Sequence, residues 1–124
     1  MAEVKVRGGD LSGLGWTIKS LMDANLGRPE VLTKVAKIQG TLVVRETGAD
    51  VANTVFFDKG EIAIEDGAIP KPTASLAAGF DELSEVTSGQ VGPIRAVLTG
   101  KIKARGNLWK LLQMAKAIII QEEE

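Results

Sequence analysis

Three short runs with the residue preferences of β-strands lie in the middle of the chain, and they constrain its fold more than any other feature. β-branched and other residues of extended preference fill positions 41–46, 53–57 and 61–65, so we expect three strands there. Between them, the segments 47–50 and 58–60 combine glycine with aspartate, a composition that favours tight turns. Three consecutive strands joined in this way predict an antiparallel meander.

Helical periodicity flanks the meander on both sides. Before it, an apolar stripe at helical spacing follows Asp10, a candidate N-cap, and consists of Leu11, Leu14, Ile18, Leu21 and Met22. Further helices are expected over residues 29–38, 80–86, 93–98 and, after the candidate N-cap Asn107, 108–119.

Two more strands complete the expected sheet. Residues 101–105 alternate strictly between polar and apolar, which indicates a half-buried strand. Residues 73–78 follow Pro70 and Pro72, and we expect them at the edge of the sheet, where proline is tolerated. Strands grouped between helices favour an α+β fold with a mainly antiparallel five-stranded sheet and helices packed on one face.

The length and the ends of the chain are also informative. The 124 residues fit one domain, residues 1–124. Residues 1–9, which end in two glycines, and the acidic tail 121–124 are expected to be flexible. The first residues lack the apolar region of a signal peptide, and no apolar run approaches the roughly 20 residues that span a bilayer. The expected localisation is cytoplasmic.

Composition excludes several classes of function. Fifteen Lys and Arg face sixteen Asp and Glu, a formal charge of −1, whereas a general nucleic-acid binder needs a basic surplus. The chain has no cysteine and no histidine, so it lacks thiol nucleophiles and the commonest general base and transition-metal ligand. We therefore expect no nucleic-acid partner, no metal, no cofactor and no catalytic residues. The serines have no histidine partner, and the carboxylates, for example Asp58 and Glu61 at a turn, favour a carboxylate-based hydrolase or isomerase only weakly.

The segment 86–107 carries a resemblance to a known family. Eight of its residues have the same spacing as the pattern of that family: Gly89, Pro93, Gly100, Lys101, Ile102, Lys103, Gly106 and Asn107. In this respect the chain resembles the sterol carrier protein type 2 family over about residues 20 to 120. The resemblance implies an apolar tunnel between the sheet and the helices. It also implies that the protein binds a fatty acid, an acyl-CoA, a phospholipid or a sterol.

The expected tunnel lining is apolar. The candidates are Phe57, Phe80, Leu83, Ile94, Val97, Leu98, Leu108, Leu111, Leu112, Ala115 and Ile119. The alternative interpretation of this set is an ordinary core-facing stripe. The chain contains three Phe and two Trp, so few bulky rings are available to fill such an interior.

Three cations are candidates for holding an anionic head group. Lys101, Lys103 and Arg105 share one face of their predicted strand and could donate charge-assisted hydrogen bonds; the alternative is a solvated strand face. Trp16 and Trp109 are either packing residues or part of a pocket mouth that touches a membrane surface transiently.

The expected function is a non-enzymatic lipid carrier that sequesters an acyl chain or another apolar ligand. The alternative is a non-catalytic accessory or scaffold module in lipid or quinone metabolism. The oligomeric state stays open.

Overall fold

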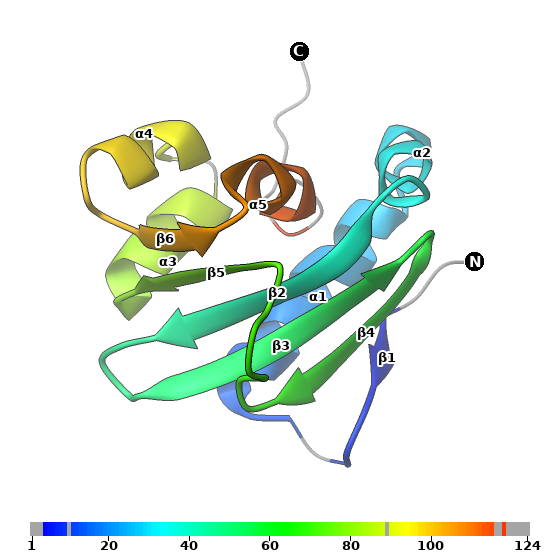
Figure 1. Ribbon diagram of the computed structural model, residues 1–124, viewed down its shortest axis with the longest axis horizontal. Coiled ribbons are helices and arrows are strands. Elements are labelled where there is room, and N and C mark those ends of the chain that lie inside the picture. Colours follow the sequence, from blue (N-terminus) through cyan, green and yellow to red (C-terminus); the bar gives the residue numbers. More distant parts are fainter. Residues whose placement is uncertain (1–3, 10, 89, 116–117, 119–124) are drawn as a thin grey trace.

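The computed structural model describes residues 4–9, 11–88, 90–115 and 118. Along the chain, these residues form β1 (Lys5–Val6), α1 (Gly13–Leu26), α2 (Pro29–Val35), β2 (Gln39–Glu46), β3 (Val51–Asp58), β4 (Glu61–Asp66), β5 (Ala74–Ala78), α3 (Phe80–Thr87), α4 (Pro93–Leu98), β6 (Lys103–Gly106) and α5 (Leu108–Ala115). Figure 1 shows one curved sheet with the helices gathered on a single face. The α+β class predicted from the sequence is confirmed.

The sheet has the strand order β1-β4-β3-β2-β5-β6. Strands β2, β3 and β4 form the predicted antiparallel meander, and β6 is antiparallel to β5. Two pairs are parallel, β1 with β4 and β2 with β5. The sheet is therefore mixed and six-stranded, although mainly antiparallel, instead of five-stranded. The sixth strand escaped prediction because two residues are too few to show a period of two.

The first described residues belong to the sheet instead of forming a free arm. Val4 is buried, and its N–H donates to Oδ1 of Asp23 at 2.9 Å. The N–H of Arg7 donates to the carbonyl of Ile64 at 2.8 Å, which extends the pairing of β1 with β4. The segment therefore joins α1 to the sheet, while the predicted acidic tail 121–124 lies outside the described residues.

Strand β5 is an interior strand, so the predicted edge position is wrong. It lies between β2 and β6, and Pro70 and Pro72 precede it, so they remove no donor from its ladder. The connection from β4 to β5 crosses the sheet face opposite the helices (Figure 1). There the buried Thr54 hydroxyl donates to the carbonyl of Gly67 at 2.8 Å and accepts from the Ile69 N–H at 3.3 Å.

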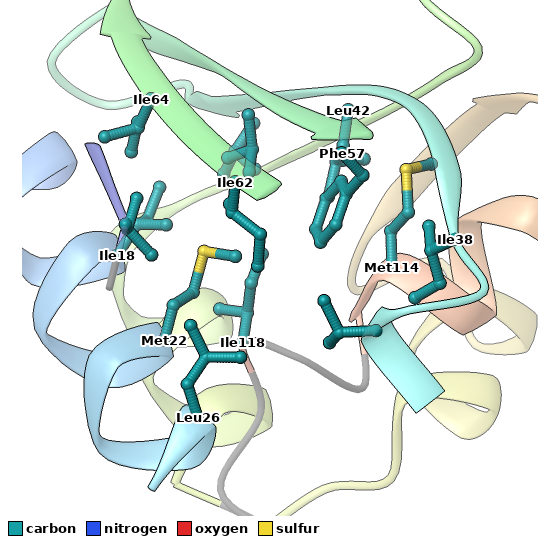
Figure 2. Packing of buried hydrophobic residues seen from close by; sticks show 14 of the residues in the cluster. Ile18, Met22, Leu26, Ile38, Leu42, Phe57, Ile62, Ile64, Met114 and Ile118 are labelled. Carbon is teal, nitrogen blue, oxygen red and sulfur yellow. The ribbon is translucent and has the colours of Figure 1, made fainter. Parts of the chain in front are cut away.

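The main core lies between the sheet and helices α1, α2 and α5. Alternate residues of β2, β3 and β4 point toward the helices, as the period of a strand requires. Figure 2 shows Met22 and Leu26 of α1 and Met114 of α5 beneath the sheet residues of this cluster. Met22, Leu42, Ile64 and Met114 are completely or almost completely buried. The prediction that the helices pack on one face is confirmed.

Helix α1 begins two residues later than its predicted cap implies. Ser12 is the N-cap, and its Oγ accepts from the N–H of Gly15 at 3.1 Å; Asp10 lies outside the described residues. Asn107 caps α5 as predicted, with Oδ1 accepting from the N–H of Lys110 at 3.0 Å. Both caps follow the preference of short polar side chains for unpaired N–H groups at a helix start.

Gly106 should be the glycine of the sheet that tolerates a side chain least. Its φ is +88°, and an added Cβ would lie 2.6 Å from the Thr73 carbonyl oxygen and 2.9 Å from Ala74 Cα. We expect Gly106→Ala to lower the free energy of unfolding by more than the roughly 1–2 kcal/mol of a left-handed residue, because β5 must shift. The matched control is Gly100→Ala, with φ +80° and open space around it. Equal losses in chemical denaturation would contradict this explanation.

Candidate functional site

An apolar cavity of about 500 Å³ lies between the sheet and helices α1, α3 and α5. Its wall combines α1 with alternate residues of the sheet and with α3, and includes Leu14, Ile18, Leu21, Val44, Leu76 and Leu83. A volume of this size falls within the range of small-molecule sites. At about 30 Å³ for each water-sized group, the cavity holds an aliphatic chain of roughly 16 methylenes.

The cavity lies where two apolar clusters meet. The main core contributes Ile18, Val44 and Ile118, whereas a smaller cluster beneath α3 and α4 contributes Val86, Ile102 and Ala115. The smaller cluster is rich in alanine, since it also contains Ala78 and Ala96. Of these alanines, Ala115 lines the cavity, and Leu76, which also lines it, packs against both clusters.

The cavity opens between the start of α1, the turn from β2 to β3, and α3. The exposed residues of its lining lie on these three segments: Gly13 and Thr17, Ala49, and Phe80 and Ser84. Phe80 is 65% exposed although it is aromatic. The mouth thus combines the aromatic ring of Phe80 with small polar groups. This arrangement suits a ligand whose head group remains near water.

A buried polar network fixes the α1 side of this mouth. Asn53 of β3 is fully buried, and its Nδ2 donates to Oδ1 of Asp66 at 2.7 Å. The Ser12 hydroxyl donates to Oδ1 of Asn53 at 3.2 Å, and the Ser12 N–H donates to Oδ1 of Asp66 at 2.8 Å. Gly15 passes so close that an added Cβ would lie 2.7 Å from Asn53 Nδ2. The start of α1 is therefore held at a fixed position on the sheet.

The structure brings three of the predicted tunnel residues to this cavity: Phe80, Leu83 and Ala115. Phe57 and Leu111 lie instead in the main core. Leu98 and Leu108 are exposed, at 81% and 49%, and neither Val97 nor Leu112 lines the cavity. The side chain of Ile94 and all of Ile119 lie outside the described residues.

The larger part of the wall was not anticipated as a binding surface. Leu14, Ile18 and Leu21 were identified as a helical stripe but not as ligand contacts, and Val44 and Leu76 were assigned only to strands. The sequence signal was present in the inward positions of α1 and β2. It could not be used because a stripe that faces a cavity has the same period as one that faces a filled core.

The predicted head-group cations lie away from the cavity. Ala104 pairs with Leu76, and both pack against the core on the helical side. Lys103 and Arg105 alternate with Ala104, so they point to the opposite face of the sheet, and both are exposed. Lys101 precedes β6, and its Nζ lies 3.4 Å from Oε1 of Glu85. None of the three lines the cavity.

The remaining candidates also lie elsewhere. Trp16 and Trp109 are 49% and 73% exposed, and neither belongs to the cavity wall. Asp58 and Glu61 line a smaller depression of about 290 Å³ beside Lys5 and Arg7. Among the described residues no cluster of acidic side chains could hold a metal ion. The described helices include none with the length and hydropathy to cross a bilayer.

Comparison with known proteins supports the same fold. The model of a family described as the SCP-2 sterol transfer family matches residues 18–118. No curated protein matches the sequence.

Three solved structures illustrate the likeness. A protein described as the UbiJ-SCP2 ubiquinone synthesis protein is 15% identical, with a TM-score of 0.69 over 85% of this chain and 92% of its own. The sterol carrier protein domain 2 of Helicoverpa armigera is 22% identical, with a TM-score of 0.62 over 94% of this chain and 100% of its own. The sec-alkylsulfatase Pisa1 from Pseudomonas sp. is 15% identical, with a TM-score of 0.64; the likeness covers 73% of this chain and 14% of that enzyme. The first two, and the matched part of the third, share the fold with this chain.

Proposed function

The chain belongs to the SCP-2 sterol transfer family, whose model matches residues 18–118, and we propose that its cavity carries the apolar part of a lipid without covalent chemistry. The observation that supports this proposal is the cavity itself. Its volume is about 500 Å³, its wall is formed mainly by aliphatic side chains, and it opens to solvent beside α3. Membership of the family implies lipid binding or transfer, and the proposal assigns that role to this cavity.

The energy available from such a cavity is sufficient for carriage. Burial of a methylene contributes about 0.8 kcal/mol, so a dozen buried methylenes contribute roughly 10 kcal/mol before the costs of ordering. Micromolar binding corresponds to about 8 kcal/mol. A chain of roughly 16 methylenes, which fills the cavity, contributes about 13 kcal/mol and reaches this range after an ordering cost of about 5 kcal/mol.

A carrier also needs a route for exchange with a membrane. Phe80 is 65% exposed at the mouth, and Trp16 of α1 is 49% exposed beside the lining residue Thr17. Tryptophan favours the interface between lipid and water because its ring is apolar and its N–H is polar, and the exposed ring of Phe80 adds apolar surface at the mouth. We propose that this side of the protein meets a membrane surface transiently while the ligand enters or leaves.

The absence of cysteine and histidine from the sequence supports a role without catalysis, because thiol nucleophiles and the commonest general base are missing. We assign no reaction to the carboxylates Asp58 and Glu61, since they lie on the turn from β3 to β4 and not at the cavity.

The proposal is tested by native mass spectrometry of the purified protein, followed by denaturing extraction of bound lipid. We expect a single copurified lipid mass at near-stoichiometric occupancy. A protein that is purified empty and also binds no added long-chain lipid would contradict carriage.

A non-catalytic scaffold role is the second candidate. It is favoured by the likeness to the UbiJ-SCP2 ubiquinone synthesis protein, which extends over 92% of that chain, and by the exposed Leu108 and Trp109 of α5. Copurified partner enzymes around a protein with an empty cavity would favour this role over carriage.

A further inference from the structure

The polar groups at the cavity mouth limit the head group that the cavity can accept. They come from Ser12 and Thr17 of the α1 region, Ser84 of α3 and Glu46 at the end of β2. Among the described residues of the lining, Glu46 is the only charged one. In its described part, the lining therefore has an anionic group and none of the cations that would pair with the head of a fatty acid or an acyl-CoA.

The strand geometry explains why Glu46 is at this place. In β2, Leu42 and Val44 face the helices and belong to the core. Glu46 is two residues after Val44, so its side chain lies on the same face. It is half-buried at the end of the strand, paired with Val51, which also lines the cavity.

The turn holds the carboxylate of Glu46 in position. Oε2 accepts from the N–H groups of Gly48 and Ala49, the latter at 3.0 Å. In the part of the chain that the structure describes, no hydrogen bond to Oε1 is present, and this oxygen can accept a further one. The adjacent cation, Arg45, is engaged elsewhere, because it pairs with Asp50 at 3.1 Å.

Two hydroxyls of the mouth are likewise acceptors. The Ser12 hydroxyl donates its proton to Oδ1 of Asn53 at 3.2 Å, and the Thr17 hydroxyl donates to the carbonyl of Gly13 at 2.9 Å. Because a hydroxyl has one proton to donate, neither has a second for a ligand. A head group that donates can still bond to these oxygens, whereas a carboxylate, which only accepts, finds no proton there and stays unpaired.

We propose that Glu46 makes the cavity selective for a neutral lipid with a hydroxyl head group over a carboxylate of the same chain length. The inference rests on the proposed lipid-carrier function and adds the ligand's chemical class to it. The alcohol donates to the free oxygen of Glu46, while a fatty-acid carboxylate at the same position faces a like charge.

The test compares 1-hexadecanol with hexadecanoate, both at submicellar concentration and pH 8, by displacement of the neutral dye Nile red. We expect the wild-type protein to bind the alcohol at least about tenfold more tightly. In Glu46→Gln, the amide oxygen can still accept from the Gly48 and Ala49 N–H groups while the charge is removed. The NH2 group then takes the place of Oε1 and can donate to either ligand. We therefore expect the affinity for hexadecanoate to rise at least about fivefold, and that for the alcohol to change less than about twofold because its hydroxyl accepts from the NH2 group instead of donating to Glu46.

The matched control is Asp81→Asn, which removes one negative charge from the first turn of α3, next in sequence to the mouth residue Phe80. Asp81 is exposed and is not part of the cavity wall. We expect no change in either affinity.

The outcomes distinguish a failure of the head-group selectivity from a failure of lipid carriage. Equal or tighter binding of hexadecanoate by the wild-type protein overturns the selectivity while carriage stands, and this comparison does not depend on the folding of any variant. A gain for hexadecanoate in Asp81→Asn as large as in Glu46→Gln overturns the role of Glu46. Binding of neither ligand overturns carriage itself.

Discussion

Replacing Ala115 by phenylalanine is expected to weaken binding of a 16-carbon lipid about a hundredfold while the protein remains folded. Ala115 is buried on α5 and lines the cavity between the two apolar clusters. A ring at this position takes the space of roughly four methylenes, and at about 0.8 kcal/mol each the loss is roughly 3 kcal/mol. Since the ring enters existing space, overpacking should cost no more than about 1–3 kcal/mol of stability.

The measurement is the dissociation constant of a series of alcohols from 8 to 16 carbons. We expect the loss to grow with chain length, because a short chain still fits the remaining space. Gln113→Phe adds the same ring to an exposed position of α5 and should leave the series unchanged. A loss in Ala115→Phe that is independent of chain length would point to a disturbed mouth instead of a filled cavity.

Leu111 lies one helical turn before Ala115. Replacing it by alanine is expected to lower the stability of the protein and to leave its affinity for lipid nearly unchanged. Leu111 is buried in the main core and does not line the cavity. Truncation of a buried leucine lowers the free energy of unfolding by about 2–5 kcal/mol, whereas the affinity of the folded protein for lipid should change less than about twofold. Denaturant titration measures the first quantity, and lipid titration well below the unfolding midpoint measures the second.

The control for this variant is Leu98→Ala, since Leu98 is 81% exposed on α4 and its truncation should change stability by about 0.5 kcal/mol or less. Together, Ala115→Phe and Leu111→Ala separate the two clusters on one helix. If Leu111→Ala lost binding as strongly as stability, the cavity would not be energetically distinct from the main core.

Local patterns in the sequence were sufficient to predict much of the fold. The meander was predictable because the turns at 47–50 and 58–60 have strong composition signals; in the structure they join β2, β3 and β4. The family was recognisable from residues 86–107, where Gly100 and Gly106 have the positive φ that favours glycine. Gly106 also lies too close to Thr73 for a side chain.

Features that depend on pairing between distant segments were not predictable. Strand β1 exists because Val4 is buried and Lys5 and Val6 meet β4, and two residues carry no period of their own. The interior position of β5 depends on a connection that crosses the far face of the sheet, where it covers Thr54. The local residue pattern therefore predicts neither strand β1 nor the interior position of β5.

The candidate site was predicted in kind but not in position. Leu111 and Ala115 belong to one helical stripe, yet the structure assigns the first to the filled core and the second to the cavity. Lys103 and Arg105 of β6 were candidates for binding a head group because strand alternation places them on one face. The register with β5 shows that this face points away from the cavity. Glu46 was assigned only to a strand, because its role depends on which face of β2 the helices cover.

The central claim is that an apolar chain occupies the space between the two clusters. Intermolecular nuclear Overhauser effects between the ligand and the protein test it most directly. The protein would be labelled at its Ile, Leu and Val methyl groups and mixed with unlabelled 1-hexadecanol. We expect contacts from the methylenes of the alcohol to Ile18, Val44 and Leu76, which line the cavity, and none to Leu42 and Val55, which are buried in the main core beyond it. Contacts confined to the exposed Leu98 and Leu108, or no contacts at all, would contradict the claim.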